Sequence, residues 1–158
     1  MNTNSPMTRR DFLAIGAAVT VSAPAILRGA DLAKEPVRLG HIGLGTRGWD
    51  LIQYTGATPR SKVVALCDVY APHLKRGLEA GGNPEAKLYQ NYHDLLADPK
   101  VEAVVIATPD HWHERMVLDA IAAGKAIYCE KGLTMSIAAA KRMRTAVKKA
   151  VARFSPQD

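Results

Sequence analysis

The 158-residue chain contains little cysteine and few aromatic side chains. Two cysteines cannot build the disulfide framework of a small secreted scaffold. Cys67 and Cys129 each end a predicted strand, and we expect two further strands, or about 14 Å, between them. A disulfide needs Cα atoms within about 7 Å, so the sequence predicts two free, buried thiols.

A basic surface with interleaved aromatic residues, the usual sign of nucleic-acid binding, is also missing. The formal net charge is +6, and the basic residues are spread along the chain apart from one cluster: Lys141, Arg142, Arg144, Lys148 and Lys149. Their helical spacing is typical of a solvated helix face. We therefore expect no nucleic-acid partner.

No apolar run is long enough for a comfortable membrane span of about 20 residues. The longest uncharged run, residues 12–27, follows the paired-arginine motif of residues 8–13 and contains the small-residue pattern Ala-Pro-Ala at 23–25. These features predict a twin-arginine signal peptide over residues 1–25, followed by a linker over 26–36. We expect export to the periplasm or the cell exterior, without stable membrane insertion.

From residue 37 onward, short apolar runs alternate with helical patterns. We expect strands at 37–42, 62–67, 86–89, 103–107 and 126–129, and helices at 46–54, from about 72 to the Gly81-Gly82 pair, 92–96, 113–123 and 136–152. This alternation predicts an α/β fold, a doubly wound parallel Rossmann sheet with helices on both faces. Right-handed crossovers then give the strand order 3-2-1-4-5, with ligands at the carboxyl ends. The domain covers residues 37–153, and 154–158 form a tail.

The first chemical motif is a glycine turn. Gly43, Gly45 and Gly48 form G-x-G-x-x-G between the first strand and the first helix. Such a turn bends sharply, lets phosphate approach the backbone and packs the helix closely on the strand. The first N–H groups of the helix then face a diphosphate, and Thr46 and Arg47 add a hydroxyl and a charge. The turn predicts dinucleotide binding.

Asp68 follows the second strand, 20 residues beyond the last glycine. A carboxylate at this position accepts the ribose hydroxyls of an adenosine and repels a 2′-phosphate. We therefore expect NAD as the cofactor, with NADP as the alternative. The competing interpretation of Asp68 is an ordinary acid at the end of a strand.

The second motif, Ala-Thr-Pro-Asp-His-Trp-His at 107–113, follows the fourth strand and faces the same crevice. Thr108 and Asp110 can cap the next helix. His111 and His113 lack further ligands, so we expect no metal site. For the histidines, proximity to nicotinamide or substrate and simple packing both stay open.

The third motif is Glu130-Lys131, after the fifth strand. The carboxylate of Glu130 can hold a ribose hydroxyl, and the ammonium of Lys131 can bind or polarise a substrate oxygen. A surface ion pair between the two residues is the structural alternative.

Together these motifs resemble the glucose–fructose oxidoreductase, inositol dehydrogenase and MocA-like family of NAD(P)-dependent oxidoreductases. The resemblance covers about residues 37–150 and is carried by IGLGTRG, ATPDHWH, YCEKGL and the tract NYHDLLADPKVEAVVIATP. It implies a nicotinamide site near Thr108, Pro109, His113, Glu130 and Lys131. It also implies that Lys131, and with it His113, lies at the hydride-transfer site as a catalytic residue.

Two features depart from the family pattern. Gly132 stands where the family has proline after Glu-Lys, and we expect this glycine to loosen the turn and to position Lys131 less well. The family also continues into a second, largely antiparallel domain that contacts substrate, and we expect this chain to lack it. We therefore expect the cofactor-binding half of an exported oxidoreductase acting on sugars or polyols, inactive by itself.

Two other functions stay open. One is a non-catalytic NAD-binding module, or a truncated remnant, that needs a separate partner chain. The other is a methyltransferase, against which the Thr-Pro and Glu-Lys motifs argue. The last predicted helix adds an expectation of marginal stability or self-association, because its apolar stripe needs cover: Ile137, Met143, Val147 and Val151.

Overall fold

A computed structural model describes residues 35–154, with side chains to residue 151. The predicted signal peptide, nearly all of the predicted linker and residues 155–158 lie outside the described residues. In the described part of the chain, no helix is both long and apolar enough to cross a bilayer.

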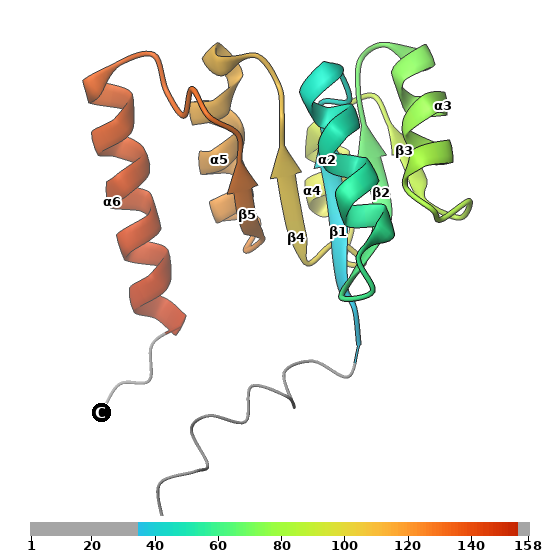
Figure 1. Ribbon diagram of the computed structural model, residues 1–158. Coiled ribbons are helices and arrows are strands. Elements are labelled where there is room, and N and C mark those ends of the chain that lie inside the picture. The colour runs from blue at the N-terminus through green and yellow to red at the C-terminus, as the bar shows by residue number, and fades with distance from the viewer. Residues whose placement is uncertain (1–34, 155–158) are drawn as a thin grey trace, which may run out of the picture. The chain divides into compact units, whose positions relative to one another are not determined.

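The described residues form one five-stranded sheet with helices on both faces (Figure 1). The strands are β1 (Val37–Ile42), β2 (Ser61–Cys67), β3 (Lys87–Tyr89), β4 (Ala103–Ile106) and β5 (Ala126–Cys129). The helices are α2 (Thr46–Ala57), α3 (Ala71–Ala80), α4 (Tyr92–Ala97), α5 (Asp110–Ala122) and α6 (Ile137–Phe154). Every strand pair is parallel and the order is β3-β2-β1-β4-β5. The predicted fold class and strand order are confirmed.

The sheet is buried on both faces around β1, β2 and β4, which explains their apolar sequences. On one face, Val104 and Ile106 of β4 pack with Met116 and Val117 of α5. On the other face, α2 and α3 cover β2 through a second cluster: Leu44, Ile52, Val63, Leu66 and Leu74. Figure 1 shows α2 and α3 in front of the strands and α4 behind them. Both layers fix the position of the carboxyl edge, where all five strands end.

One expectation needs correction at the β5 side of the sheet. Both cysteines are free, but only Cys67 is buried, whereas Cys129 is half-buried because β5 is an edge strand. Of the four apolar residues predicted to need cover on α6, only Met143 is buried. Ile137 and Val147 are 77% and 44% exposed, since the described residues place no strand beyond β5.

The start of α5 also differs from the prediction. The helix begins at Asp110 rather than His113, directly after Pro109. Neither Thr108 nor Asp110 caps it, because Asp110 lies inside the first turn and the Thr108 hydroxyl faces the Met116 sulfur at 3.5 Å. The predicted capping role is therefore wrong for both residues.

A buried histidine lies in the centre of the fold. His41 of β1 is fully buried against α2, where its Nε2 lies 2.9 Å from the Thr55 hydroxyl. That hydroxyl already donates to the helix carbonyls of Leu51 and Ile52, so Nε2 is the donor and Nδ1 the unprotonated nitrogen. Nδ1 is buried without a hydrogen-bond partner. A proton on Nδ1 would bury a charge, and burial lowers the pKa of His41 from 6.5 to about 4.

We predict that acid weakens the fold through His41. A base whose folded pKa is lowered contributes its full stability above pH 6.5 and loses it as pH falls toward 4. Each pKa unit corresponds to about 1.4 kcal/mol, so the loss near pH 4 is about 3 kcal/mol. Urea unfolding between pH 7 and 4.5 measures it. The variant His41→Leu should flatten this pH dependence; an unchanged slope would contradict the prediction.

We also predict that the domain self-associates through the β5 side. The outer edge of β5 pairs with no described strand, and open edges favour association. Val147→Lys, which places charge beside this edge, should weaken association roughly tenfold in sedimentation experiments. Thr145→Lys adds the same charge to another face of α6 and should have little effect. A wild-type domain that stays monomeric at high concentration would rule the association out.

Candidate functional site

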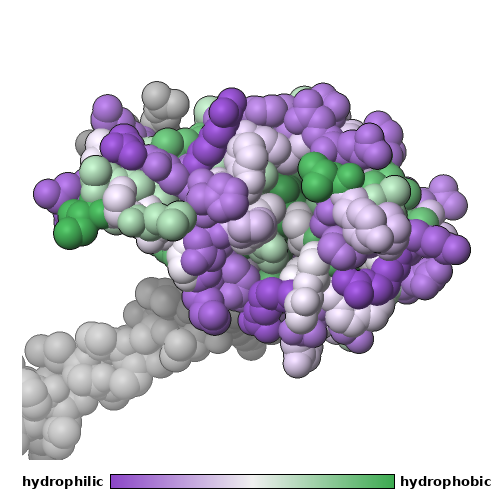
Figure 2. All heavy atoms as spheres, turned by 90° about the horizontal axis from the view of Figure 1, so that it is seen from above, coloured by the Kyte–Doolittle hydropathy of each residue, from purple (hydrophilic) through white to green (hydrophobic). Residues whose placement is uncertain are grey.

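The candidate site lies at the carboxyl edge of the sheet, on both sides of the end of β1. Figure 2 looks down on this edge and shows mostly hydrophilic residues around a paler, mixed centre. A cleft of about 300 Å³ opens there between the ends of β1, β2 and β4. Its lining combines the turn, the predicted acid and the start of α5: Ile42, Gly43, Cys67, Asp68, Val69, Gln90, Tyr92, Thr108, Trp112 and Met116. The structure therefore brings Gly43, Asp68 and Thr108 together, as predicted.

The glycine turn has no room for a side chain at two of its three glycines and has free space at the third. Gly43 has φ +87°, and a Cβ there would lie 2.7 Å from the Ala107 carbonyl oxygen. A Cβ on Gly48 would lie 2.0 Å from the Gly43 carbonyl oxygen, so only glycine lets α2 pack this closely. A Cβ on Gly45 would meet no atom within 4 Å. The turn thus leaves its free space at Gly45.

The start of α2 lies beside that free space. Gly45 is the N-cap residue and no side chain caps the helix. The first N–H groups of a helix need acceptors, and its partial positive charge favours an anion. Thr46 and Arg47 are exposed at this helix start. The donors, the charge and the open space at Gly45 fit a diphosphate.

Asp68 is held by donors from its own domain. Its Oδ2 accepts the Leu44 N–H at 2.7 Å and lies 3.2 Å from Nδ1 of His73, while Oδ1 accepts the Tyr70 N–H at 2.8 Å. The first of these bonds ties the end of β2 to the glycine turn. A carboxylate oxygen accepts two hydrogen bonds, so Oδ1 keeps capacity for another donor such as a ribose hydroxyl.

Glu130 accepts hydrogen bonds from three groups of the site. Its Oε1 accepts Nε of Arg47 at 2.8 Å and the Tyr128 hydroxyl at 3.0 Å, and its Oε2 accepts the Lys131 N–H at 2.9 Å. The hydrogen bond from the Lys131 N–H, then that from Arg47, lowers the pKa of Glu130 to about 2. The structural alternative, an ion pair between the Glu130 and Lys131 side chains, is not formed, and Glu130 pairs with Arg47 instead. The side chain of Lys131 extends into solvent at this edge.

His113 faces inward rather than into the cleft. Its ring is fully buried, with Nε2 2.8 Å from the Thr108 carbonyl and Nδ1 3.0 Å from the Gly132 carbonyl. A direct catalytic contact would require a ring nitrogen to leave its carbonyl. The structure instead gives His113 a positioning role, because it joins the turn after β4 to the turn after β5. His111 and Pro109 lie exposed at the start of α5.

Gly132 does not loosen its turn, contrary to our expectation. Its φ is +72°, which proline cannot adopt, and an added Cβ would lie 2.4 Å from the Asp110 carboxylate. The His113 ring holds its carbonyl from the other side. The glycine therefore adopts a backbone conformation that proline could not, and its carbonyl is held by the His113 ring.

Comparison with known proteins agrees with this geometry. Residues 37–157 match the GFO_IDH_MocA family, described as an oxidoreductase family with an NAD-binding Rossmann fold. The chain belongs to this family. The described Gfo/Idh/MocA domain is thus an NAD-binding Rossmann domain, as the sequence predicted.

Individual relatives of the Gfo/Idh/MocA domain include two curated proteins. The chain is 36% identical over 145 residues to a glycosyl hydrolase family 109 protein of Stenotrophomonas maltophilia, covering 82% of this chain and 31% of that protein. It is 38% identical over 108 residues to an inositol 2-dehydrogenase of Pseudomonas fluorescens, covering 68% and 32%.

A solved structure gives the same result. The NAD binding oxidoreductase of Klebsiella pneumoniae superposes with a TM-score of 0.64 at 32% identity, over 74% of this chain and 33% of that one. The chain spans about a third of the length of the relatives it matches.

Sequence reasoning missed three partners within the Gfo/Idh/MocA domain. His73 lies on α3 beside Asp68, Tyr128 donates to Glu130, and Arg47 pairs with Glu130 across 83 positions. The alternation of side chains along a strand could have linked Tyr128 with Glu130, since residues two positions apart point to the same face of a sheet. A histidine on the helix that follows the strand-end acid could have suggested His73. No local pattern connects Arg47 with Glu130.

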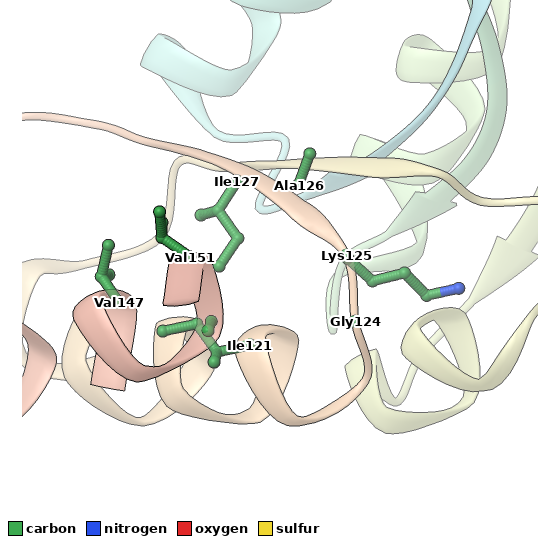
Figure 3. A pocket seen from close by; sticks show the side chains of 8 residues that line it. Ile121, Gly124, Lys125, Ala126, Ile127, Val147 and Val151 are labelled. Atoms are coloured by element: carbon green, nitrogen blue, oxygen red, sulfur yellow. The ribbon is translucent and has the colours of Figure 1, made fainter. Parts of the chain in front are cut away.

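A larger groove of about 530 Å³ lies elsewhere, between β5, the end of α5 and α6 (Figure 3). Ile121, Ile127 and Val147 are among its apolar lining residues. The amine of Lys125 donates to the Asp98 and Val101 carbonyls. Lys125 has the only polar side chain among the described residues that line the groove, and its amine is already hydrogen-bonded. The groove therefore offers no cluster of polar side chains for catalysis.

We predict that Gly132→Ala destabilises the domain more than Gly124→Ala. Both glycines have φ near +70°, but only Gly132 is crowded, since a Cβ on Gly124 would meet nothing within 4 Å. The backbone strain costs about 1 kcal/mol in either variant, and the clash with Asp110 adds roughly 1–2 kcal/mol. Urea unfolding of both variants measures the difference. Equal losses of stability in the two variants would show that the Asp110 side chain moves aside without cost.

Proposed function

We propose that this chain is the cofactor-binding half of an exported, NAD-dependent oxidoreductase that acts on sugars or polyols. The observation that carries the proposal is the glycine turn, closed at Gly43 and Gly48 and open at Gly45, with a carboxylate on each side. Asp68 lies at the end of β2 and Glu130 after β5, so the two acids flank the turn along one edge.

Each residue then has a role along the dinucleotide. The α2 start with Gly45 and Thr46 binds the diphosphate, and Arg47 adds positive charge. Asp68 accepts the adenosine ribose, which favours NAD over NADP because a carboxylate repels a 2′-phosphate. Glu130 accepts the second ribose, and Thr108 and Pro109 line the nicotinamide side.

Substrate chemistry centres on Lys131. A bound nicotinamide supplies hydride transfer to or from a secondary alcohol or carbonyl carbon. The Lys131 side chain, exposed after β5, polarises the substrate oxygen as an ammonium or deprotonates it as a neutral amine. His113 fixes this arrangement through the carbonyls of Thr108 and Gly132. The names of the relatives, an inositol dehydrogenase and a glycosyl hydrolase, support a polyhydroxylated ring as substrate.

We further propose that the described domain binds the cofactor without turning over substrate. Lys131 and Pro109 lie exposed at an open edge, and a pocket must enclose most of a small substrate. The missing wall comes from residues outside this domain, in the same chain or in a partner chain. The paired-arginine segment supports export by the twin-arginine route.

Gly45→Val tests the proposal. A valine side chain at Gly45 would extend into open space, where the diphosphate should lie, and the negative φ of −64° accepts it without strain. NADH affinity should fall at least about tenfold, measured by fluorescence titration, with the unfolding midpoint unchanged.

The matched control is Gln53→Val, which places the same side chain on an exposed part of α2 two turns away. It should leave NADH affinity unaltered. Wild-type protein that binds S-adenosylmethionine but not NADH would refute the proposal, as would a Gly45→Val variant with full NADH affinity.

A further inference from the structure

One ion pair crosses the proposed cofactor path. Arg47 extends from the first turn of α2, and its Nε donates to Oε1 of Glu130, which follows β5. Between β1 and β5 lies β4, whose end carries Thr108 and Pro109. The pair therefore spans the half of the edge that the proposed function assigns to the nicotinamide.

The two partners differ in how firmly they are held. The Arg47 side chain is 52% exposed, whereas that of Glu130 is 9% exposed. Arg47 contacts Glu130 through Nε, and its other nearby acid, Asp50, is 3.9 Å away. A guanidinium with one hydrogen bond to its partner and half its surface in water can move at low cost.

Glu130 remains paired when Arg47 leaves. The Tyr128 hydroxyl still donates to Oε1 and the Lys131 N–H still donates to Oε2. An acid left buried without a partner would resist such an exchange strongly, but these two donors prevent that outcome. The departure of Arg47 also returns acceptor capacity to Oε1, which a ribose hydroxyl can use.

A guanidinium binds carboxylate and phosphate oxygens by the same charge-assisted hydrogen bonds. We propose that Arg47 exchanges partners: it pairs with Glu130 in the free protein and with the diphosphate when the cofactor binds. This inference rests on the proposed function. Glu130 thus competes with the diphosphate for Arg47, and diphosphate binding frees Glu130 for the nicotinamide ribose.

ADP tests the exchange, because it carries the diphosphate but no second ribose. Glu130→Gln removes the competing charge, so ADP should bind about two- to fivefold more tightly. NADH should gain less or lose affinity, because its second ribose loses a charged acceptor. Arg47→Met should weaken ADP binding, and in the double variant Glu130→Gln should no longer have an effect. Calorimetric titration gives all four affinities, and circular dichroism checks each fold.

Glu114→Gln is the matched control. It removes the charge from another Glu–Arg pair, with Arg142, on the helices α5 and α6, and should leave ADP affinity unchanged. Should Glu130→Gln fail to fold, Glu130→Asp shortens the side chain away from Arg47 and carries the same expectation. Unchanged or weaker ADP binding in the folded Glu130 variant overturns the exchange. Wild-type protein that binds neither ADP nor NADH would instead overturn the proposed function.

Discussion

The contact between Gly48 and the Gly43 carbonyl is the constraint on which the site depends. Because a Cβ at Gly48 would lie 2.0 Å from that oxygen, α2 can start against the end of β1 only with glycine at this position. The resulting backbone directs the Leu44 N–H to Asp68 and places Arg47 within reach of Glu130. This one close backbone contact therefore positions the partners of both acids, Leu44 for Asp68 and Arg47 for Glu130.

The sequence predicted the strands well because they are signalled locally. Apolar runs of four to six residues gave both ends of every strand to within one residue, and the glycine spacing and strand-end acids gave the cleft. The start of α5 was predicted three residues too late, at His113, whereas Pro109 is the N-cap and Asp110 begins the helix. Gly132 was misjudged because its neighbour, Asp110, lies 22 positions earlier, and only the folded chain brings the two together.

Long-range pairing was the part that sequence could not supply. Arg47 and Glu130 are 83 positions apart, and either residue taken alone has several plausible partners. His113 shows the same limit, because its sequence neighbours did not decide its role. Its sequence position beside Trp112 suits either chemistry or packing, and the choice depends on carbonyls of Thr108 and Gly132 that point at its ring.

The acids of the site are prepared for ligand before any ligand arrives. Asp68 and Glu130 each accept a hydrogen bond from a backbone N–H, a donor with no side-chain entropy of its own to lose, and this bond keeps the carboxylate in place. Because the pKa of Glu130 is about 2, this acid is ionised throughout the neutral range and cofactor binding requires no proton release from it. What remains adjustable is Arg47, the exposed cation between them. In the proposed exchange, the two acids keep their backbone hydrogen bonds while the Arg47 side chain alone changes partner.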